Sequence, residues 1–174
     1  MARIKIDYGI DLGTTNSSIC RMEKGEPVII RTDTLKETLP SCVSVNKKGG
    51  VKAGDGAYNT MKSDKRRATK NWTAEPSNTS VEFKRTMGTD TAYPSSNAGR
   101  QFTSEQLSAE VLKTLKSFVT DEDVRSVVIT VPAKFTVGQK TATIQAFKKG
   151  FMEAGPILLE PIASLKVTVP DEYT

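Results

Sequence analysis

The sequence has no histidine and only two cysteines, and these shortages exclude several kinds of active site. Without histidine, the chain can form neither a Ser-His nor a Cys-His nucleophile pair. Zinc sites use clustered cysteine and histidine ligands, whereas Cys20 and Cys42 stand apart and belong to no Cys-x-x-Cys motif. Two isolated cysteines do not suggest a disulfide framework either. Any chemistry therefore has to use carboxylates, lysines, hydroxyl groups, backbone amides or a hard metal ion.

Long hydrophobic runs and aromatic residues are also scarce. No stretch approaches the roughly 20 apolar residues of a membrane span, and the N-terminal MARIKIDYG lacks the apolar region of a signal peptide. We therefore expect a cytoplasmic protein with no membrane partner. The net charge is +5 and no basic stripe is interleaved with aromatic residues, so no nucleic-acid partner is expected. The densest basic cluster, KSDKRRATK at 62–70, is typical of a solvated helix face.

What the sequence does contain is a series of short apolar segments separated by turns. With 174 residues, the chain has the length of about one domain. Residues 56–72 are compatible with a helix, and the composition of residues 89–100 predicts a loop. The N-terminal third predicts an antiparallel meander followed by a small hairpin, with strands at residues 4–12, 17–23, 27–32, 42–46 and 51–54.

Two helices in the second half are marked by capping boxes, in which a threonine hydroxyl and a glutamine amide each bind an orphan backbone N–H group. Thr103 and Gln106 form the first pair, and apolar residues at helical spacing follow it. Thr136 and Gln139 form the second pair, and we expect the helix that they open to continue to about Ala154.

Strands are expected between and after these helices. Residues 126–131, SVVITV, form a near-continuous apolar run typical of a strand buried on both faces, and residues 165–169 predict one more strand. The order of elements predicts an α/β domain in which antiparallel hairpins lead into a parallel portion. We expect a core subdomain of residues 1–42 and 103–174, with residues 43–102 as an inserted subdomain.

The stretch YGIDLGTTNSS at 8–18 combines the groups that a phosphate site needs. Asp11 ends an apolar strand, which holds its carboxylate on a rigid element, and Gly13 lets backbone approach a ligand closely. The segment Thr14–Asn16 adds hydroxyl, amide and backbone N–H donors, and successive N–H groups in a turn form an anion-binding nest. A carboxylate beside phosphate requires a hard cation between them, so Asp11 implies Mg²⁺ bound through water. The alternative is a polar hairpin turn; neither a GxxxxGK[ST] nor a GxGxxG motif is present.

This stretch resembles the first phosphate loop of the seventy-kilodalton heat-shock chaperones, the DnaK-like family. The resemblance covers about residues 4–146 and implies an actin-like ATPase (ribonuclease H-like) lobe. Such a lobe has a mixed sheet with N-terminal antiparallel hairpins, flanking helices and a small α+β insert. Four further segments resemble the family in the same order: TLPSCVSV (38–45), AGDGAYN (53–59), FKRTMG (83–88) and VVITVPAKFTVGQKTAT (127–143).

The resemblance implies ATP or ADP with Mg²⁺ as cofactors and the N-terminal loop as their phosphate site. Asp11 would lie near the metal ion and its water. Lys84 would contact the γ-phosphate and the attacking water, a role that suits a compact ammonium group with several donors. The alternative for Lys84 is a solvated lysine. The implied phosphate contacts are Gly13, Thr14, Thr15 and Asn16.

Four other residues correspond to family positions outside the phosphate loop. Arg85 would support the interface with a second, substrate domain. Pro132 resembles the switch proline that relays the nucleotide state outward, and it also terminates a strand. Lys140 stands where the family usually has a relay arginine, but a lysine lacks the bidentate fork of arginine. Glu160 resembles a catalytic-side glutamate, and the alternative for it is a carboxylate that caps a loop.

The tail departs from the family pattern. Residues 146–174 keep a Glu-Pro pair but otherwise resemble a segment of translation elongation factor G, in which Glu160 would be an ordinary loop residue. A divergent natural gene, a recombined fragment and a deliberate chimera are the alternative origins of such a chain.

These features predict one of the two lobes that close on nucleotide in this fold. The second phosphate loop is not found in the sequence, and a ligand needs most of its surface covered to bind well, so we expect weak ATP binding and no significant hydrolysis by this lobe alone. The alternative is an inert structural fragment, and a sugar kinase of the same fold is disfavoured. The family implies a peptide-binding domain, co-chaperones and unfolded clients as partners, and an exposed cleft face favours self-association.

Overall fold

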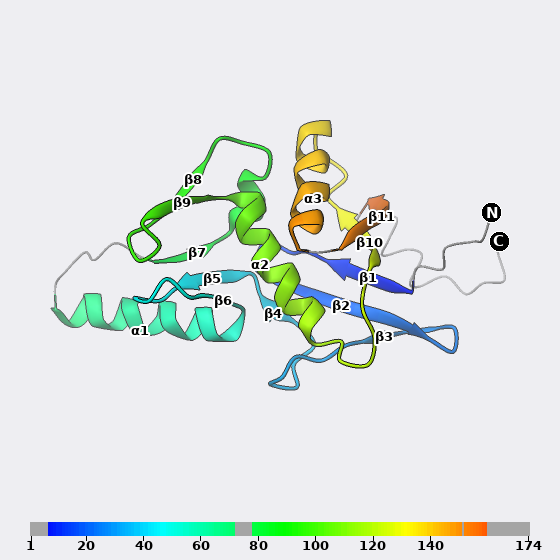
Figure 1. Ribbon diagram of the computed structural model, residues 1–174, viewed down its shortest axis with the longest axis horizontal. Coiled ribbons are helices and arrows are strands. Elements are labelled where there is room, and N and C mark those ends of the chain that lie inside the picture. Colours follow the sequence, from blue (N-terminus) through cyan, green and yellow to red (C-terminus); the bar gives the residue numbers. More distant parts are fainter. Residues whose placement is uncertain (1–6, 72–77, 151, 160–174) are drawn as a thin grey trace.

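The computed structural model describes residues 7–71, 78–150 and 152–159. Within them, a six-stranded sheet has the order β11-β10-β1-β2-β3, and β4 pairs with β2 (Figure 1). The predicted α/β fold with a mixed sheet is confirmed. The strands of this sheet are β1 (Tyr8–Asp11), β2 (Asn16–Glu23), β3 (Glu26–Ile29), β4 (Leu39–Pro40), β10 (Ser126–Val131) and β11 (Glu153–Leu159).

Strand β1 lies inside the sheet and has a neighbour of each kind. It forms the predicted antiparallel hairpin with β2, where Asp11 pairs with Ser18. It runs parallel to β10, where Gly9 pairs with Val128. Because parallel neighbours end at the same edge of a sheet, the turn after β1 and the loop after β10 lie on one side of the molecule.

One face of this sheet is buried and the other is partly open. In β10, Val127, Ile129 and Val131 are fully buried, whereas the alternate residues Ser126 and Thr130 are partly exposed. The prediction that residues 126–131 are buried on both faces is therefore wrong. The described helices pack against one face only, which gives the alternation of a half-buried strand.

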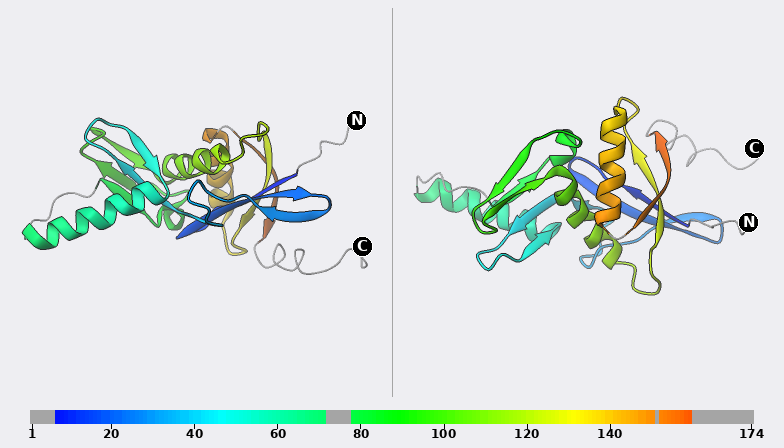
Figure 2. Two further views of the ribbon diagram at one scale, coloured as in Figure 1. Left: turned by 90° about the horizontal axis from the view of Figure 1, so that it is seen from below. Right: turned by 45° about the horizontal axis from the view of Figure 1, so that its top comes forward.

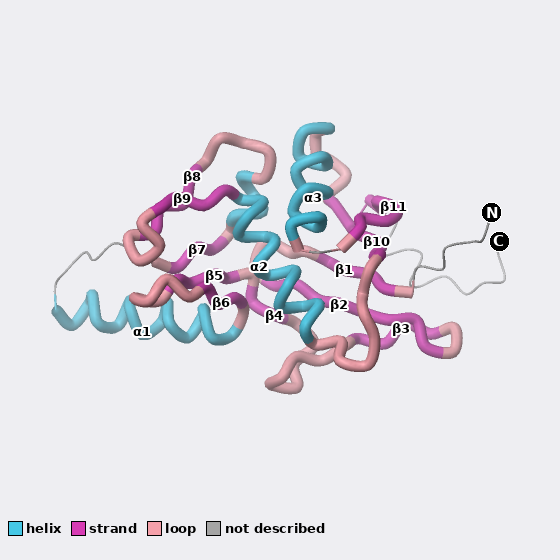
Figure 3. The backbone as a smooth tube through the Cα atoms, viewed as in Figure 1, coloured by secondary structure: helices cyan, strands magenta, loops and turns pink. Residues whose placement is uncertain are grey.

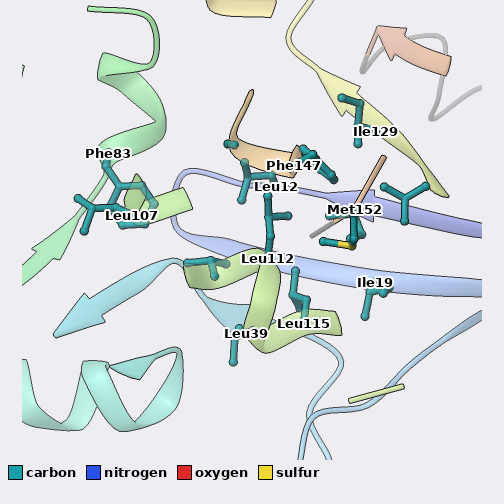
Figure 4. Close-up of a cluster of buried hydrophobic side chains, with 14 of the residues drawn as sticks. Leu12, Ile19, Leu39, Phe83, Leu107, Leu112, Leu115, Ile129, Phe147 and Met152 are labelled. Atoms are coloured by element: carbon teal, nitrogen blue, oxygen red, sulfur yellow. The ribbon is translucent and has the colours of Figure 1, made fainter. Parts of the chain in front are cut away.

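Helices α2 (Ser104–Ser117) and α3 (Val137–Lys149) cover the buried face (Figure 2). Both predicted capping boxes are present, with Thr103 and Thr136 each accepting from the backbone N–H group of the glutamine three residues later. The hydrophobic core lies between these helices and the sheet (Figure 4). Its labelled members are Leu12, Ile19, Leu39, Phe83, Leu107, Leu112, Leu115, Ile129, Phe147 and Met152.

A smaller group of elements lies beside the long sheet (Figure 3). A three-stranded sheet of order β6-β5-β7 packs on α1, and a separate hairpin is formed by β8 and β9. The predicted hairpin of residues 42–46 and 51–54 is confirmed as the β5–β6 pair. These elements are β5 (Cys42–Val45), β6 (Val51–Ala53), α1 (Asp55–Asn71), β7 (Thr79–Val81), the 3-10 helix η1 (Phe83–Thr86), β8 (Ala92–Ser95) and β9 (Arg100–Thr103).

The loop predicted for residues 89–100 is wrong, because strand β8 forms there and pairs with β9. Tyr93 lies opposite Phe102 across this hairpin. Phe102 is buried in the core, and the ring of Tyr93 meets that of Phe83 edge-on at 6.4 Å. The local composition, with Ser, Asn and Gly, is that of a turn, and the packing of these aromatic rings, which it does not reveal, makes the flanking residues strands.

Helix α3 ends five residues earlier than the expected Ala154, at Lys149. Gly150 fits closely against α2, since an added Cβ would lie 3.0 Å from Leu112 Cβ. The chain then turns into β11, which runs parallel to β10 with a register shift that spans Gly155 and Pro156. A bulge of this kind accommodates a proline, which has no N–H group for the ladder. The strand predicted at 165–169 lies outside the described residues.

Among the described residues, none of the helices has the length and apolar character needed to span a bilayer.

Candidate functional site

The turn between β1 and β2, residues 12–15, is folded back tightly on itself. A Cβ atom at Gly13 would lie 1.9 Å from the backbone oxygen of Asn16, closer than any side chain allows. Glycine is therefore required here by space. The backbone amides of Thr14 and Thr15 donate to no other described residue. Two adjacent N–H groups in such a turn form the start of an anion-binding nest.

A closed ring of hydrogen bonds holds this turn in shape. The N–H group of Gly13 donates to Ser17 Oγ over 3.2 Å, and Ser41 Oγ donates to the Gly13 carbonyl oxygen over 2.7 Å. The two serine hydroxyls are 2.8 Å apart and both are buried, so the Ser17 hydroxyl closes the ring by donating to Ser41. The backbone N–H group of Ser41 also donates to the Thr15 carbonyl oxygen.

Sequence reasoning did not identify either serine as part of the site. Ser17 stands inside the quoted stretch, but it is buried where β2 pairs with β4, opposite the buried Leu39, which the local sequence does not show. Ser41 stands 28 residues from Gly13, and no local pattern connects the two. The only available signal is the position of Ser41 inside TLPSCVSV, one of the segments that carry the family resemblance.

Asp11 lies at the end of β1 with its side chain exposed on the open face of the sheet. Thr130, on the neighbouring strand β10, donates a hydrogen bond from its hydroxyl to Asp11 Oδ1 over 3.1 Å. Thr130 lies one residue before the end of β10, at the same edge of the sheet as the end of β1. Its hydrogen bond therefore holds the Asp11 carboxylate beside the turn. Thr130 is a further residue that the sequence did not single out.

The predicted phosphate contacts surround the same turn. Thr15 and Asn16 are exposed and Thr14 is half-buried, so their polar groups lie at the surface next to Asp11 and Gly13. The structure thus brings all five loop residues together.

Lys84 is buried, with 6% of its surface exposed, on the 3-10 helix η1. Its ammonium nitrogen lies 5.7 Å from the ring centroid of Phe135, within the range of a cation–π contact. Phe135 belongs to the turn that follows β10, where its N–H group donates to the Pro132 carbonyl oxygen over 2.9 Å. Because the Lys84 side chain is buried, the alternative of a solvated lysine is wrong. Buried lysines are rare in folded proteins.

The segment that carries Lys84 is fixed on several sides. Thr86 Oγ1 lies 2.6 Å from the Tyr93 hydroxyl oxygen and 2.7 Å from Ser104 Oγ, so it joins η1 to β8 and to the start of α2. Gly88, with φ of 73°, lies against the backbone of Gly138 in the first turn of α3. The segment 83–88 therefore lies beside the loop after β10. Strand β10 also carries Thr130, which binds the Asp11 carboxylate.

The other predicted residues are less connected to this site. Arg85 is exposed, unlike the buried Lys84, and forms an ion pair with Glu82 at 3.5 Å. Pro132 directly follows β10 and is half-buried, and Lys140 lies half-buried in the first turn of α3. No hydrogen bond or ion pair of the Lys140 side chain is found among the described residues. Glu160 lies outside the described residues.

A metal ion at Asp11 would take most of its ligands from water or phosphate. In the described part of the chain, no group of three or more Asp, Glu, Cys or His side chains could hold a metal. One carboxylate, with hydroxyl groups nearby, suits Mg²⁺, which retains several water ligands and binds through one or two carboxylates and substrate phosphates.

Most of the shifted pKa values lie at the opposite end of the β1–β2 hairpin. Burial and a hydrogen bond to Glu122 raise the pKa of the Tyr8 hydroxyl. Tyr8 pairs across the hairpin with Arg21, which binds Asp121 at 2.6 Å and lowers the pKa of that carboxyl group. Burial also raises the pKa of the Cys42 thiol to about 11.

A mixed sheet with flanking helices is consistent with a lobe of an actin-like ATPase. The family model for the Hsp70 protein matches residues 7–165, which is most of the chain. This chain belongs to the Hsp70 family. Members of this family bind ATP with Mg²⁺ and work with co-chaperones and clients.

The matched range includes all five segments on which the resemblance rests. It also continues 19 residues beyond Ala146, where we expected the resemblance to end. The match gives no support to an elongation factor G origin of the tail.

Proposed function

We propose that this chain forms the phosphate-binding lobe of an Hsp70 ATPase, with the β1–β2 turn and Lys84 facing the phosphates of ATP. The observation that carries the proposal is the burial of Lys84 beside the loop after β10. Strand β10 also positions Asp11, through the hydrogen bond from Thr130. Lysine is a compact cation with several donors, and its place beside this loop would let it meet a polyphosphate there.

The residues would divide the work by their chemistry. The Thr14 and Thr15 amides would bind phosphate oxygens, and the threonine and asparagine side chains would add donors. Asp11 would orient the water ligands of Mg²⁺, which shields its carboxylate from the phosphates. Lys84 would stabilise charge on the γ-phosphate and orient the attacking water. Pro132, Lys140 and Arg85 are proposed to relay the nucleotide state, and Glu160 to lie on the catalytic side.

Hydrolysis is proposed to require a second lobe that closes over the nucleotide. In this fold both lobes contribute phosphate contacts, and positioning supplies most of the catalysis of phosphoryl transfer. Residues 1–174 on their own are therefore proposed to bind ATP weakly, since one lobe leaves the adenosine largely exposed. Half-buried and exposed apolar residues on the open face, such as Met22 and Ile29, favour self-association at high concentration.

The test is a titration of the ¹⁵N-labelled protein with ATP and MgCl₂, followed by amide chemical shifts and by calorimetry. We expect dissociation constants well above the low micromolar range, with shifts concentrated at residues 11–16 and near Lys84. Lys84→Met should reduce these shifts, whereas Lys148→Met, a matched change of an exposed lysine, should not. Low micromolar binding would contradict the one-lobe proposal, and shifts spread elsewhere or absent would favour an inert fragment.

Two subdomains stay a prediction: a core of residues 1–42 and 103–174 and an insert of residues 43–102. A cytoplasmic location and a peptide-binding domain as partner stay predictions too.

A further inference from the structure

Helix α1 carries most of the net charge of the chain on its exposed surface. Residues 62–70 contain five basic residues and one acidic residue, a net charge of +4, while the whole chain carries +5. All five cations are exposed, namely Lys62, Lys65, Arg66, Arg67 and Lys70.

The opposite side of α1 packs on the three-stranded sheet and is made of different residues. Ala57 is buried, and Met61, Asp64 and Ala68 are less exposed than their neighbours. Their spacing of four, three and four residues defines one helix face, which contacts β5. The C-terminal half of the helix extends away from the rest of the molecule (Figures 1 and 2). The cations therefore form an accessible surface.

The cations are not balanced as they would be on a face that serves only solubility. Arg67 forms an ion pair with Asp64, but Lys65, Arg66 and Lys70 have no ion pair among the described residues. Like charges are neighbours at four spacings of three or four residues, and each such pair destabilises the helix. The like-charged pairs are Lys62 with Lys65, Lys62 with Arg66, Arg66 with Lys70, and Arg67 with Lys70.

Three of the cations form a row along the helix that winds gently around its axis. Lys62, Arg66 and Lys70 are each four residues apart, a rise of about 6 Å per step. Tyr58 continues the row toward the N-terminus, and its ring lies 4.4 Å below the Lys62 ammonium nitrogen. Acidic residues placed at every fourth position of a helix, or at every second position of an extended chain, have about the same spacing as these cations.

We propose that the basic row of α1 binds an acidic polypeptide segment of a partner protein. Charge complementarity supports an anionic partner, and the spacing matches carboxylates on a regular backbone. A nucleic acid is less suitable, because Tyr58 is the one aromatic residue of the row and Lys62 already lies over a face of its ring, which leaves little for bases to stack on. A membrane is less suitable too, because the basic row offers no aliphatic side chain for insertion.

The test uses fluorescein-labelled poly-L-glutamate of 20 residues as the probe and fluorescence anisotropy as the measurement. The wild-type protein should bind it, and affinity should fall as NaCl is raised from 50 to 500 mM because exposed ion pairs are screened. The triple change Lys62→Glu, Arg66→Glu and Lys70→Glu should weaken binding about tenfold or more, as expected for three exposed ion pairs.

The matched control changes three exposed lysines elsewhere, Lys47→Glu, Lys148→Glu and Lys149→Glu, and gives the same net charge. It should bind poly-L-glutamate within about twofold of the wild type once net charge is screened. Circular dichroism of both variants checks that each is folded. Equal losses in the two variants, or no binding by the wild type, would overturn the proposal. Tighter binding of a 20-nucleotide oligothymidylate, or of phosphatidylserine vesicles, than of poly-L-glutamate would also overturn it.

Discussion

The hydroxyl group of Ser41 donates a hydrogen bond of 2.7 Å to the carbonyl oxygen of Gly13, which stands 28 residues earlier in the chain. Together with Ser17, this contact closes a ring of hydrogen bonds around the β1–β2 turn. The shape of the candidate phosphate turn is therefore set by a residue on the segment between β4 and β5 as well as by the turn itself.

Ser41→Ala should destabilise the protein and loosen the turn. The change leaves the buried Ser17 hydroxyl and the Gly13 carbonyl without their partner, which costs about 1–3 kcal/mol in the free energy of unfolding. Urea denaturation measures this cost. Ser63→Ala, a change of an exposed serine on α1, should stay within about 0.5 kcal/mol of the wild type. An equal effect of the two changes would mean that the ring is unimportant.

Gly13→Ala and Gly56→Ala should have effects of opposite sign. The new Cβ at Gly13 would meet the Asn16 backbone oxygen at 1.9 Å, so the turn must rearrange at a cost of about 1–3 kcal/mol. Gly56 lies in the first turn of α1, where an added Cβ would make only an ordinary contact with Lys52 Cδ at 3.9 Å, and alanine there should stabilise the helix by up to about 1 kcal/mol. Thermal unfolding of the two variants tests the contrast, which fails if both shift the midpoint in the same direction.

Thr86→Val should disturb the placement of Lys84. Valine keeps the shape of threonine but removes the hydroxyl that meets Tyr93 and Ser104, which costs about 1–3 kcal/mol. We expect the amide resonances of residues 83–88 to shift and the response of Lys84 to MgATP to weaken. Thr86→Ser restores the hydroxyl and should recover both. If serine rescues neither, the hydroxyl contacts do not position this segment.

The thiol of Cys42 should react slowly in the folded protein. Burial raises its pKa to about 11 from an ordinary value of 9.0, so the thiolate fraction at pH 8 falls roughly 100-fold. Labelling with iodoacetamide at pH 8, followed by mass spectrometry, should modify Cys42 at least that much more slowly than in 6 M guanidinium chloride. Equal rates in the two conditions would contradict the buried position.

The ion pair of Asp121 with Arg21 should make folding stability sensitive to acid. Its hydrogen bond to Arg21 lowers the pKa of the Asp121 carboxyl group in the folded state, from an ordinary value of 3.8. The pair therefore stabilises the fold above about pH 4 and loses this contribution as pH falls through the lowered pKa. Asp121→Asn should reduce the loss of stability between pH 7 and pH 2.5, measured by urea unfolding. Asp90→Asn, in a loop, serves as the control and should leave that difference unchanged.

Local sequence patterns predicted the parts of the fold that depend on local interactions. Both capping boxes and the β1–β2 hairpin are encoded by residues a few positions apart, so they are visible in the sequence. The β8–β9 hairpin is also local, but its strands depend on the packing of Tyr93 and Phe102 against the core, which the composition of the segment does not show. The early end of α3 depends on the close fit of Gly150 to Leu112 of α2, a contact between distant parts of the chain. The site divides in the same way. Gly13 and its neighbours are apparent from the sequence, whereas Ser41 and Thr130 reach the turn only through the fold.

The parallel pairing of β1 with β10 has a consequence for synthesis of the protein. Asp11 and its partner Thr130 are separated by 119 residues. At a translation rate of about 5–20 residues per second, β1 leaves the ribosome roughly 6 to 24 seconds before the strand that completes its side of the sheet. During this interval the hairpin of β1 and β2 presents an unpaired strand edge to other chains. While it is being synthesised, this chain therefore has the exposed strand edge that makes nascent chains prone to aggregation.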